Sequence, residues 1–291
     1  MNIEYIYLKH YDLIFHAMAY FKVNNASNLY DENYISKMEA EKAGFTYDIA
    51  RAASTLQEYY NENFERLMII NFLPYYCKDY DEMKNGLLHY QHFTHEDVQV
   101  FIKPFIEMLD NESIFFFEYW EKTDTASKSS KPAAENYLQA KLGQYSCIFD
   151  YFRKPSKIIF SHSITNNGRG IYDDSYFAAC VRYPENEMAY GSTFLQLLHE
   201  YTHSFTDGLL NKSINMKDGS HNLSEYVVVM TDYYLIKAID DSFIPVYFDW
   251  ISNGCGVEMD EDKFLDMFNI DEHLRAEMMK LIDDILNLRT N

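Results

Sequence analysis

The chain has 291 residues with a formal net charge of −20, and 47% of its residues are hydrophobic. This length and apolar content exclude general disorder and predict a substantial core divided between two subdomains. The acidity disfavours binding to nucleic acid and to anionic membrane surfaces, because both depend on basic patches. We interpret the acidic residues as a solvated surface.

The first 120 residues predict a helical subdomain, because apolar and aromatic side chains recur there at steps of three and four. The aromatic residues at this spacing are best explained by packing between helices. The segments expected to form helices are Ile6–Phe21, Glu32–Lys42, Tyr47–Tyr60, Phe64–Tyr76 and Asp97–Trp120.

Three histidines in this subdomain, His89, His92 and His95, follow one another at steps of three. Such steps could gather imidazoles on one helix face and bind a metal. However, Thr94 and the acidic residues that follow His95 indicate a cap that opens a new helix. This cap would separate His95 from the other two, so we interpret all three as solvated surface residues.

Residues 121–131, EKTDTASKSSK, are small and polar and predict a linker between the helical subdomain and a core that spans residues 132–291. The core begins with an expected helix over Pro132–Phe152. Two β-like runs follow, Lys157–Ser161 and Ser175–Tyr183, with a turn at Asn166–Gly170 between them.

The stretch Thr193–Asn211 contains H-E-x-x-H, with His199 and His203 four residues apart and Glu200 beside the first. An apolar stripe at helical spacing predicts a buried amphipathic helix here. A four-residue step on a helix turns only about 40° past one full turn, so both imidazoles project from one face. They could share one Zn²⁺, beside which Glu200 would act as a general base.

A catalytic zinc needs a third protein ligand. Glu225 lies 22 residues beyond His203, in the first turn of a second expected helix whose apolar run is Tyr226–Ile239. We interpret Glu225 as the third ligand, with His221 and Asp207 as alternatives. A glutamate in a first turn is also favoured by the helix dipole, which is the ordinary explanation for this residue.

The run H-E-Y-T-H-S-F-T-D from His199 to Asp207, followed by a helix that carries Glu225, resembles the gluzincin metallopeptidases, of which thermolysin-like enzymes are familiar members. The specific part of this resemblance covers about forty residues. It implies one zinc ion per chain, bound by His199, His203 and Glu225, and a water activated by Glu200. It also implies a zincin-like catalytic core with a small sheet.

One position departs from the family pattern. Many gluzincins have an aspartate four residues after the glutamate ligand, where it orients the first histidine, and Val229 occupies that position here. Asp232, two turns along from Glu225, is the candidate for this role. In zincin-like folds the edge strand of the sheet also binds extended peptide by backbone pairing. Tyr176–Tyr183 is the candidate edge strand, although an internal strand explains this run almost as well.

The four cysteines are scattered without a C-x-x-C pair, so we expect small core residues rather than disulfides: Cys77, Cys147, Cys180 and Cys255. Glu4, Lys9 and Asp12 interrupt any apolar run near the N-terminus, which does not read as a signal peptide. No run of 18 apolar residues occurs that could cross a membrane. We therefore expect a cytoplasmic protein.

The expected fold class is α+β and predominantly helical, with an N-terminal helical subdomain beside the zincin-like core. Two C-terminal helices, near Phe264–Phe268 and Leu274–Leu288, would cover that core. The expected activity is zinc-dependent hydrolysis of peptide bonds in a peptide or protein substrate, with Glu200 as general base. A donor to the oxyanion is also needed, and the residues considered for it are His221, Tyr226, Tyr233 and Arg182.

Two other functions are compatible with the same residues. One is a catalytically silent protein, stabilised by zinc, that binds a peptide or protein in a zincin-like cleft. The other is a helical scaffold in which the motif is accidental. The intact Glu200 favours the enzyme, because a zinc site used only for binding does not need an activated water.

Overall fold

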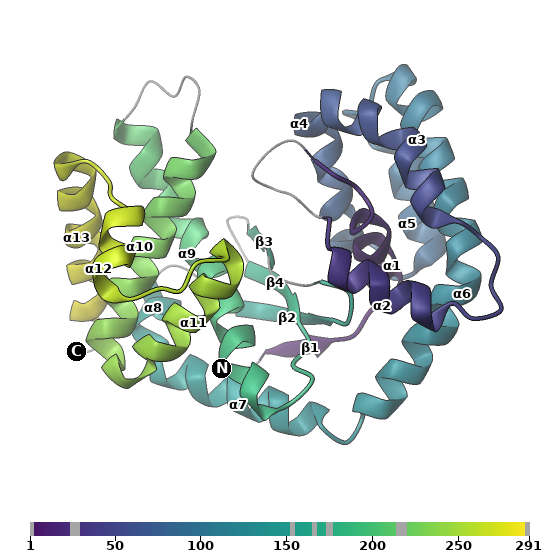
Figure 1. Cartoon of the computed structure of the whole chain (residues 1–291). Coiled ribbons are helices and arrows are strands. Elements are labelled where there is room, and N and C mark those ends of the chain that lie inside the picture. The colour runs from purple at the N-terminus through teal and green to yellow at the C-terminus, as the bar shows by residue number, and fades with distance from the viewer. Residues whose placement is uncertain are drawn as a thin grey trace. The chain divides into compact units, whose positions relative to one another are not determined.

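The computed structural model describes residues 3–23, 30–151, 155–164, 168–172, 177–213 and 220–288. The chain is predominantly helical and has a small four-stranded mixed sheet, which confirms the α+β class (Figure 1). Two compact units are present. Unit 1 comprises Met1–Ile6, Ser130–Ile159 and Asn166–Asn291, and unit 2 comprises Tyr7–Ser129 and Phe160–Thr165.

The sheet has the strand order β1-β2-β4-β3. β1 runs parallel to β2, with Tyr5 opposite Ile158, whereas β3 runs antiparallel to β4, with Gly170 opposite Ala179. The bounds of the strands are Glu4–Ile6 for β1, Pro155–Ser161 for β2, Arg169–Tyr172 for β3 and Phe177–Arg182 for β4.

The edge of the sheet beside β4 is formed by β3, so the expectation of an edge strand at Tyr176–Tyr183 is wrong. β4 is an internal strand, and its residues from Phe177 to Val181 are buried. Such a continuous apolar run is typical of a strand covered on both faces. The edge strand β3 takes Arg169 and Gly170 from the segment expected to be a turn, and its residues are only half-buried.

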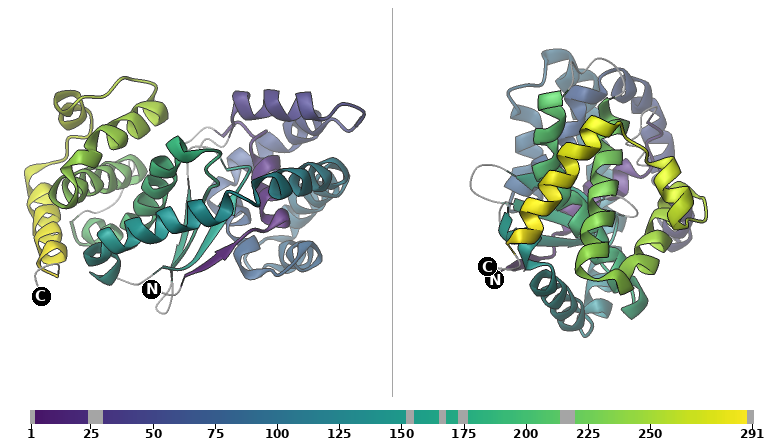
Figure 2. Two further views of the ribbon diagram at one scale, coloured as in Figure 1. Left: turned by 90° about the horizontal axis from the view of Figure 1, so that it is seen from below. Right: turned by 90° about the vertical axis from the view of Figure 1, so that its left-hand side faces the viewer.

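Helix α9 is the central element of unit 1. It lies against β3 and β4, and α7, α10, α11 and α13 pack around it (Figures 1 and 2). Its apolar residues from Phe194 to Tyr201 are buried in this environment, and the ring of Tyr201 lies 4.9 Å from that of Phe177 in β4. The helices of unit 1 are α7 (Lys131–Gln144), α8 (Ser146–Tyr151), η4 (Glu187–Ala189), α9 (Tyr190–Ser213), α10 (Ser220–Ile239), η5 (Asp241–Phe243), α11 (Ile244–Cys255), α12 (Glu261–Met267) and α13 (Glu272–Asn287).

Unit 2 is built from helices around a core rich in aromatic side chains. Tyr60, Phe101 and Phe105 are fully buried there, and the rings of Phe101 and Phe105 stack at 5.3 Å. The elements are α1 (Lys9–Met18), α2 (Glu32–Glu41), α3 (Ile49–Glu62), α4 (Phe64–Leu67), the 3-10 helices η1 (Met68–Asn71) and η2 (Leu73–Tyr76), α5 (Tyr80–His89), the π-helical turn η3 (Asp97–Ile102) and α6 (Lys103–Ser127).

Some of the acidic residues cap the N-termini of helices. Asp31, Asp48 and Asp79 precede α2, α3 and α5, and each accepts a hydrogen bond from a backbone N–H of the first turn. Asp260 and Asp271 cap α12 and α13 in the same way. An aspartate at this position satisfies an otherwise unpaired donor and complements the helix dipole.

Two predicted boundaries differ from the structure. α6 continues to Ser127 and α7 begins at Lys131, so most of the expected linker at residues 121–131 is helical. That segment is polar but contains no proline or glycine, and Lys122 pairs with Glu118 one turn earlier at 2.6 Å. Residues 4–6 form β1 and belong to unit 1 rather than to the first helix, because they pair with β2.

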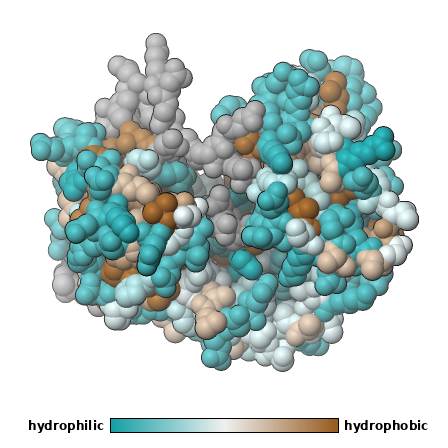
Figure 3. Space-filling view, viewed as in Figure 1, coloured by the Kyte–Doolittle hydropathy of each residue, from teal (hydrophilic) through white to brown (hydrophobic). Residues whose placement is uncertain are grey.

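The surface visible in Figure 3 is mostly hydrophilic where the structure describes it, and hydrophobic residues are scattered over it. Within the described residues, no helix has the length and apolar character needed to cross a membrane. Cys77, Cys147 and Cys180 are buried free thiols, as expected, whereas Cys255 is exposed.

A buried carboxylate lies in the core of unit 2. Asp12 of α1 accepts hydrogen bonds from the indole N–H of Trp120 at 2.6 Å, from the backbone N–H of His162 at 3.1 Å and from the hydroxyl of Ser161. Burial raises the pKa of Asp12 from its usual 3.8 to about 6, although these hydrogen bonds oppose the shift.

This raised pKa predicts an unusual pH dependence of stability. The folded state binds the Asp12 proton more tightly than the unfolded state, so this group adds stability as pH falls through about 6 and loses it as pH rises. When the pH is lowered from about 7 to about 5, the unfolding free energy of wild type should increase by about 1 kcal/mol more than that of Asp12→Asn. Urea unfolding at both pH values measures this difference, and equal changes in both proteins would contradict it.

Candidate metal centre

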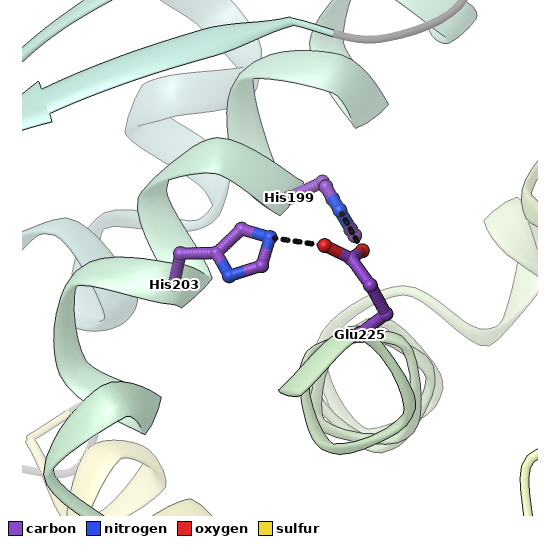
Figure 4. A group of neighbouring side chains, drawn as sticks. All are labelled: His199, His203 and Glu225. Carbon is purple, nitrogen blue, oxygen red and sulfur yellow. Dashed lines mark ion pairs between the residues drawn. The ribbon is translucent and has the colours of Figure 1, made fainter. Parts of the chain in front are cut away.

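Three side chains with metal-binding atoms converge between α9 and α10. His199 and His203 lie one turn apart on α9, Glu225 comes from α10, and the three point toward one another (Figure 4). Glu225 lies in the second turn rather than the first, because α10 begins at Ser220. Oε2 of Glu225 is 3.2 Å from Nε2 of His199, and Oε1 is 3.5 Å from Nε2 of His203.

The three side chains lie close enough to share one metal ion. Ligand atoms bound to zinc at 2.0–2.2 Å with tetrahedral angles stand about 3.4 Å from one another. The two carboxylate oxygens of Glu225 each approach a different imidazole, at 3.2 and 3.5 Å, and one nitrogen or oxygen atom from each of the three residues can be chosen so that all three lie within 4.8 Å of one another. Two imidazoles and a carboxylate could therefore bind a metal ion here. Within the described part of the chain, no other group of His, Cys, Asp or Glu has this arrangement.

The ring of His199 lies between two carboxylates. Its Nδ1 is 3.2 Å from Oδ2 of Asp232, while its Nε2 faces Glu225. Burial alone would lower the pKa of His199, but the hydrogen bonds with Asp232 and Glu225 raise it to about 10. The surroundings of this ring therefore stabilise positive charge. A hydrogen bond from Nδ1 to Asp232 also leaves Nε2 available for a metal.

Asp232 is itself held in place by α9. It is buried, and its Oδ1 accepts a hydrogen bond from the hydroxyl of Thr202 at 2.5 Å. Seven residues separate Asp232 from Glu225, which is close to two full turns, so both carboxylates lie on the face of α10 toward α9. Asp232 thereby contacts His199 through the ring nitrogen opposite the one that faces Glu225.

Glu200 lies on the side of α9 that faces the sheet. Its backbone and side chain pack against two glycines of the edge strand region. Gly168 immediately precedes β3, and Gly170 lies within it. The carboxylate is half-buried, and a Cβ atom at Gly170 would lie 3.3 Å from its Oε2. The side chain of Glu200 thus points toward β3, away from the face of α9 that carries His199 and His203.

The first histidine has an aromatic neighbour on α11. The ring of Trp250 lies 5.6 Å from that of His199 in an edge-on contact, and Trp250 is half-buried. The rings of His199 and His203 are themselves 4.9 Å apart and nearly perpendicular. These contacts restrict the rotation of the His199 ring.

Several residues considered from the sequence have other partners. The hydroxyl of Tyr233 donates to Glu261 at 2.5 Å, and the guanidinium of Arg182 lies 3.4 Å from Glu185. Tyr226 packs its ring against Phe268 at 5.4 Å. The side chains of the alternative ligands, His221 and Asp207, lie outside the described residues.

The three histidines of unit 2 do not form a metal-binding group. Nδ1 of His89 contacts the carbonyl of Asn85 within α5, and Nε2 of His92 lies 3.2 Å from the amide nitrogen of Gln91. His95 is exposed. These contacts agree with their interpretation as surface residues.

Sequence reasoning did not identify the contacts of Thr202, Trp250 and Gly168. Thr202 occupies a position in the apolar stripe of α9, and only its proximity to Asp232 gives it a role. The G-x-G spacing of Gly168 and Gly170 is a usable signal, because alternate residues of a strand face the same side. Trp250 is far from His199 in the sequence, and no local sequence pattern indicates their contact.

Comparisons of the chain with protein-family models, with curated proteins and with solved structures give no match.

We expect about one zinc ion per chain in wild-type protein purified without a chelator, and loss of this zinc in His203→Ala and in Glu225→Ala. Elemental analysis of the purified proteins measures the content, and His92→Ala serves as a control with a surface histidine removed. A wild-type protein that takes up no zinc even when it is supplied would refute the site. Loss in His203→Ala with retention in Glu225→Ala would instead point to His221 or Asp207 as the third ligand.

Replacing Asp232 with asparagine should weaken metal affinity by about 10- to 100-fold, because the partner that orients His199 loses its charge. Thr202→Val leaves the carboxylate of Asp232 in place and removes the hydroxyl that contacts it and the carbonyl of Leu198, so its effect on metal affinity should be smaller. Competition with a chromophoric chelator measures both affinities. Wild-type affinity in Asp232→Asn would show that this carboxylate does not support the ligand.

Proposed function

We propose that the protein is a zinc-dependent peptidase with a zincin-like catalytic core. The observation that carries this proposal is the convergence of His199, His203 and Glu225, with Glu200 of the same H-E-x-x-H motif held on the adjoining side of α9. Residue types, order and spacing agree with the gluzincin ligand set. The position of α9 between an edge strand and a second helix that carries the glutamate also agrees with a zincin-like core.

The exposure of the site favours catalysis over a purely structural metal. Structural zinc sites are closed by four protein ligands, whereas catalytic sites keep one position open. Among the described residues, three candidate ligands are brought together here, and the side chains of His203 and Glu225 remain 22% and 31% exposed. Solvent can therefore reach these two side chains.

Each residue has a defined task in the proposed hydrolysis. Zinc, when bound, would polarise the substrate carbonyl and acidify a water molecule. Glu200 accepts the proton from the attacking water and later gives it to the leaving amine. Asp232 and Thr202 keep the ring of His199 in one orientation, so that the ligand geometry is maintained during the reaction.

The edge strand β3 supplies a means of binding the substrate backbone. One side of β3 pairs with β4, and the other side is the edge of the sheet. An extended peptide could add to this edge through main-chain hydrogen bonds. Because Glu200 packs on the same strand, a peptide bound in this way would lie near the proposed base.

Replacing Glu200 with glutamine should lower the hydrolysis rate by about 10²- to 10⁴-fold while zinc content stays unchanged, because only the proton acceptor is lost. A mixture of internally quenched peptides, analysed by fluorescence and mass spectrometry, measures cleavage. Glu187→Gln provides a matched change at an exposed glutamate near the start of α9.

Wild-type activity in Glu200→Gln would remove this residue from the mechanism. A zinc-loaded wild type that cleaves no peptide, but binds peptides equally well with and without this substitution, would instead identify a zinc-stabilised binding protein.

A further inference from the structure

We propose that Gly168 is a positioning residue for Glu200 and that Gly170 sets the approach of α9 to β3: the absence of side chains at these two positions leaves the space in which the glutamate lies. This inference rests on the proposed function, because the position of Glu200 matters most if it acts as the general base. The contacts that support it are independent of any bound metal.

Gly168 makes the closest approach. A Cβ atom at this position would lie 2.8 Å from Cγ of Glu200 and 3.1 Å from its Oε1. Carbon atoms in favourable contact are about 3.5–4.0 Å apart, so 2.8 Å is a collision. The same Cβ atom would lie 3.2 Å from the carbonyl oxygen of Cys180 in β4, which prevents the strand from moving away on that side. Any side chain at position 168 must therefore displace Glu200.

Gly170, two residues after Gly168, also lies close to Glu200. A Cβ atom there would lie 3.2 Å from the backbone oxygen of Glu200 and 3.3 Å from both its Cβ and its Oε2. Because alternate residues of a strand face the same side, Gly168 and Gly170 both face α9. Ala179, which is paired with Gly170 across the sheet, is also small.

A left-handed backbone conformation does not explain the glycine at position 170. Among the described residues, the glycines with positive φ are Gly44 at 98° and Gly256 at 69°, and Gly170 lies in the extended strand β3. The requirement for glycine there is therefore the close approach of Glu200.

The two glycines predict different consequences of substitution. Glu200 contacts Gly168 through its side chain, which can rotate away, so Gly168→Ala should move the carboxylate with little loss of stability. Gly170 contacts the backbone oxygen and Cβ of Glu200, which cannot move unless α9 moves. Gly170→Ala should therefore separate α9 from β3 and lower the melting temperature by several degrees.

The experiment compares wild type with Gly168→Ala, Gly170→Ala and Glu200→Gln. Gly208→Ala is the matched control, because Gly208 also lies on α9 and a Cβ atom there would have no neighbour within 4 Å. Five quantities are measured: zinc content, melting temperature, kcat, KM for a peptide from the cleavage screen, and the visible spectrum of the Co²⁺-substituted protein.

In Gly168→Ala we expect zinc content and melting temperature close to those of wild type and little change in KM. We expect kcat to fall about a hundredfold, because a displacement of about 1 Å in a reacting group has an effect of this size. The Co²⁺ spectrum should move toward that of Glu200→Gln, and the double variant should be no slower than Glu200→Gln alone. Gly208→Ala should match wild type in zinc content, kcat, KM and Co²⁺ spectrum, and its melting temperature should be equal or slightly higher because alanine favours the helix.

A Gly168→Ala protein with the kcat and the Co²⁺ spectrum of wild type would overturn the inference. It would also be overturned if this variant lost as much zinc or thermal stability as Gly170→Ala, because the glycine would then have a general structural role. If wild type cleaves no peptide but Gly168→Ala and Glu200→Gln share an altered Co²⁺ spectrum, the positioning role stands and the proposed peptidase function fails.

Discussion

The packing of α10 against α9 is the contact on which the candidate site depends. α9 supplies two imidazoles, and among the described residues the carboxylates that contact them come from α10. Glu225 and Asp232 reach opposite nitrogens of His199 because two turns of one helix separate them. A rotation of α10 by one residue, about 100°, would remove both carboxylates at once. The ligand cluster and the support for its first histidine are therefore fixed by a single interhelical register.

The opposite side of α9 has a different task. There the helix approaches β3 so closely that a Cβ atom at Gly168 or Gly170 would lie within 3.3 Å of atoms of Glu200. Metal ligands and the proposed base are thus held by two separate contacts of one helix, with α10 on one side and the edge strand on the other. This division lets the carboxylate of Glu200 stay outside the ligand cluster although it neighbours His199 in sequence.

The sequence pattern predicted the features that depend on the period of a single helix. It failed for features that depend on pairing between distant segments. The common face of His199 and His203 follows from a four-residue step, and Glu225 follows from the need for a third ligand. The order of the strands depends on pairing between remote segments, so the edge position of β3 could not be derived from its own residues. The polar segment at residues 121–131 indicated a linker, but polarity without proline or glycine is compatible with a solvated end of α6. The partner of His199 was uncertain because Asp232 lies seven residues from Glu225 rather than four.

The pairing of β1 with β2 has a consequence for the order of folding. Tyr5 lies opposite Ile158, so this contact closes a loop of about 150 residues, and most of that loop is unit 2. During synthesis from the N-terminus, β1 has no partner strand until the whole of α1–α6 has left the ribosome. α9 and α10 follow later still. We therefore expect the nascent chain to gain affinity for metal only in its last stage of synthesis, after the helical unit has had time to fold around its own core.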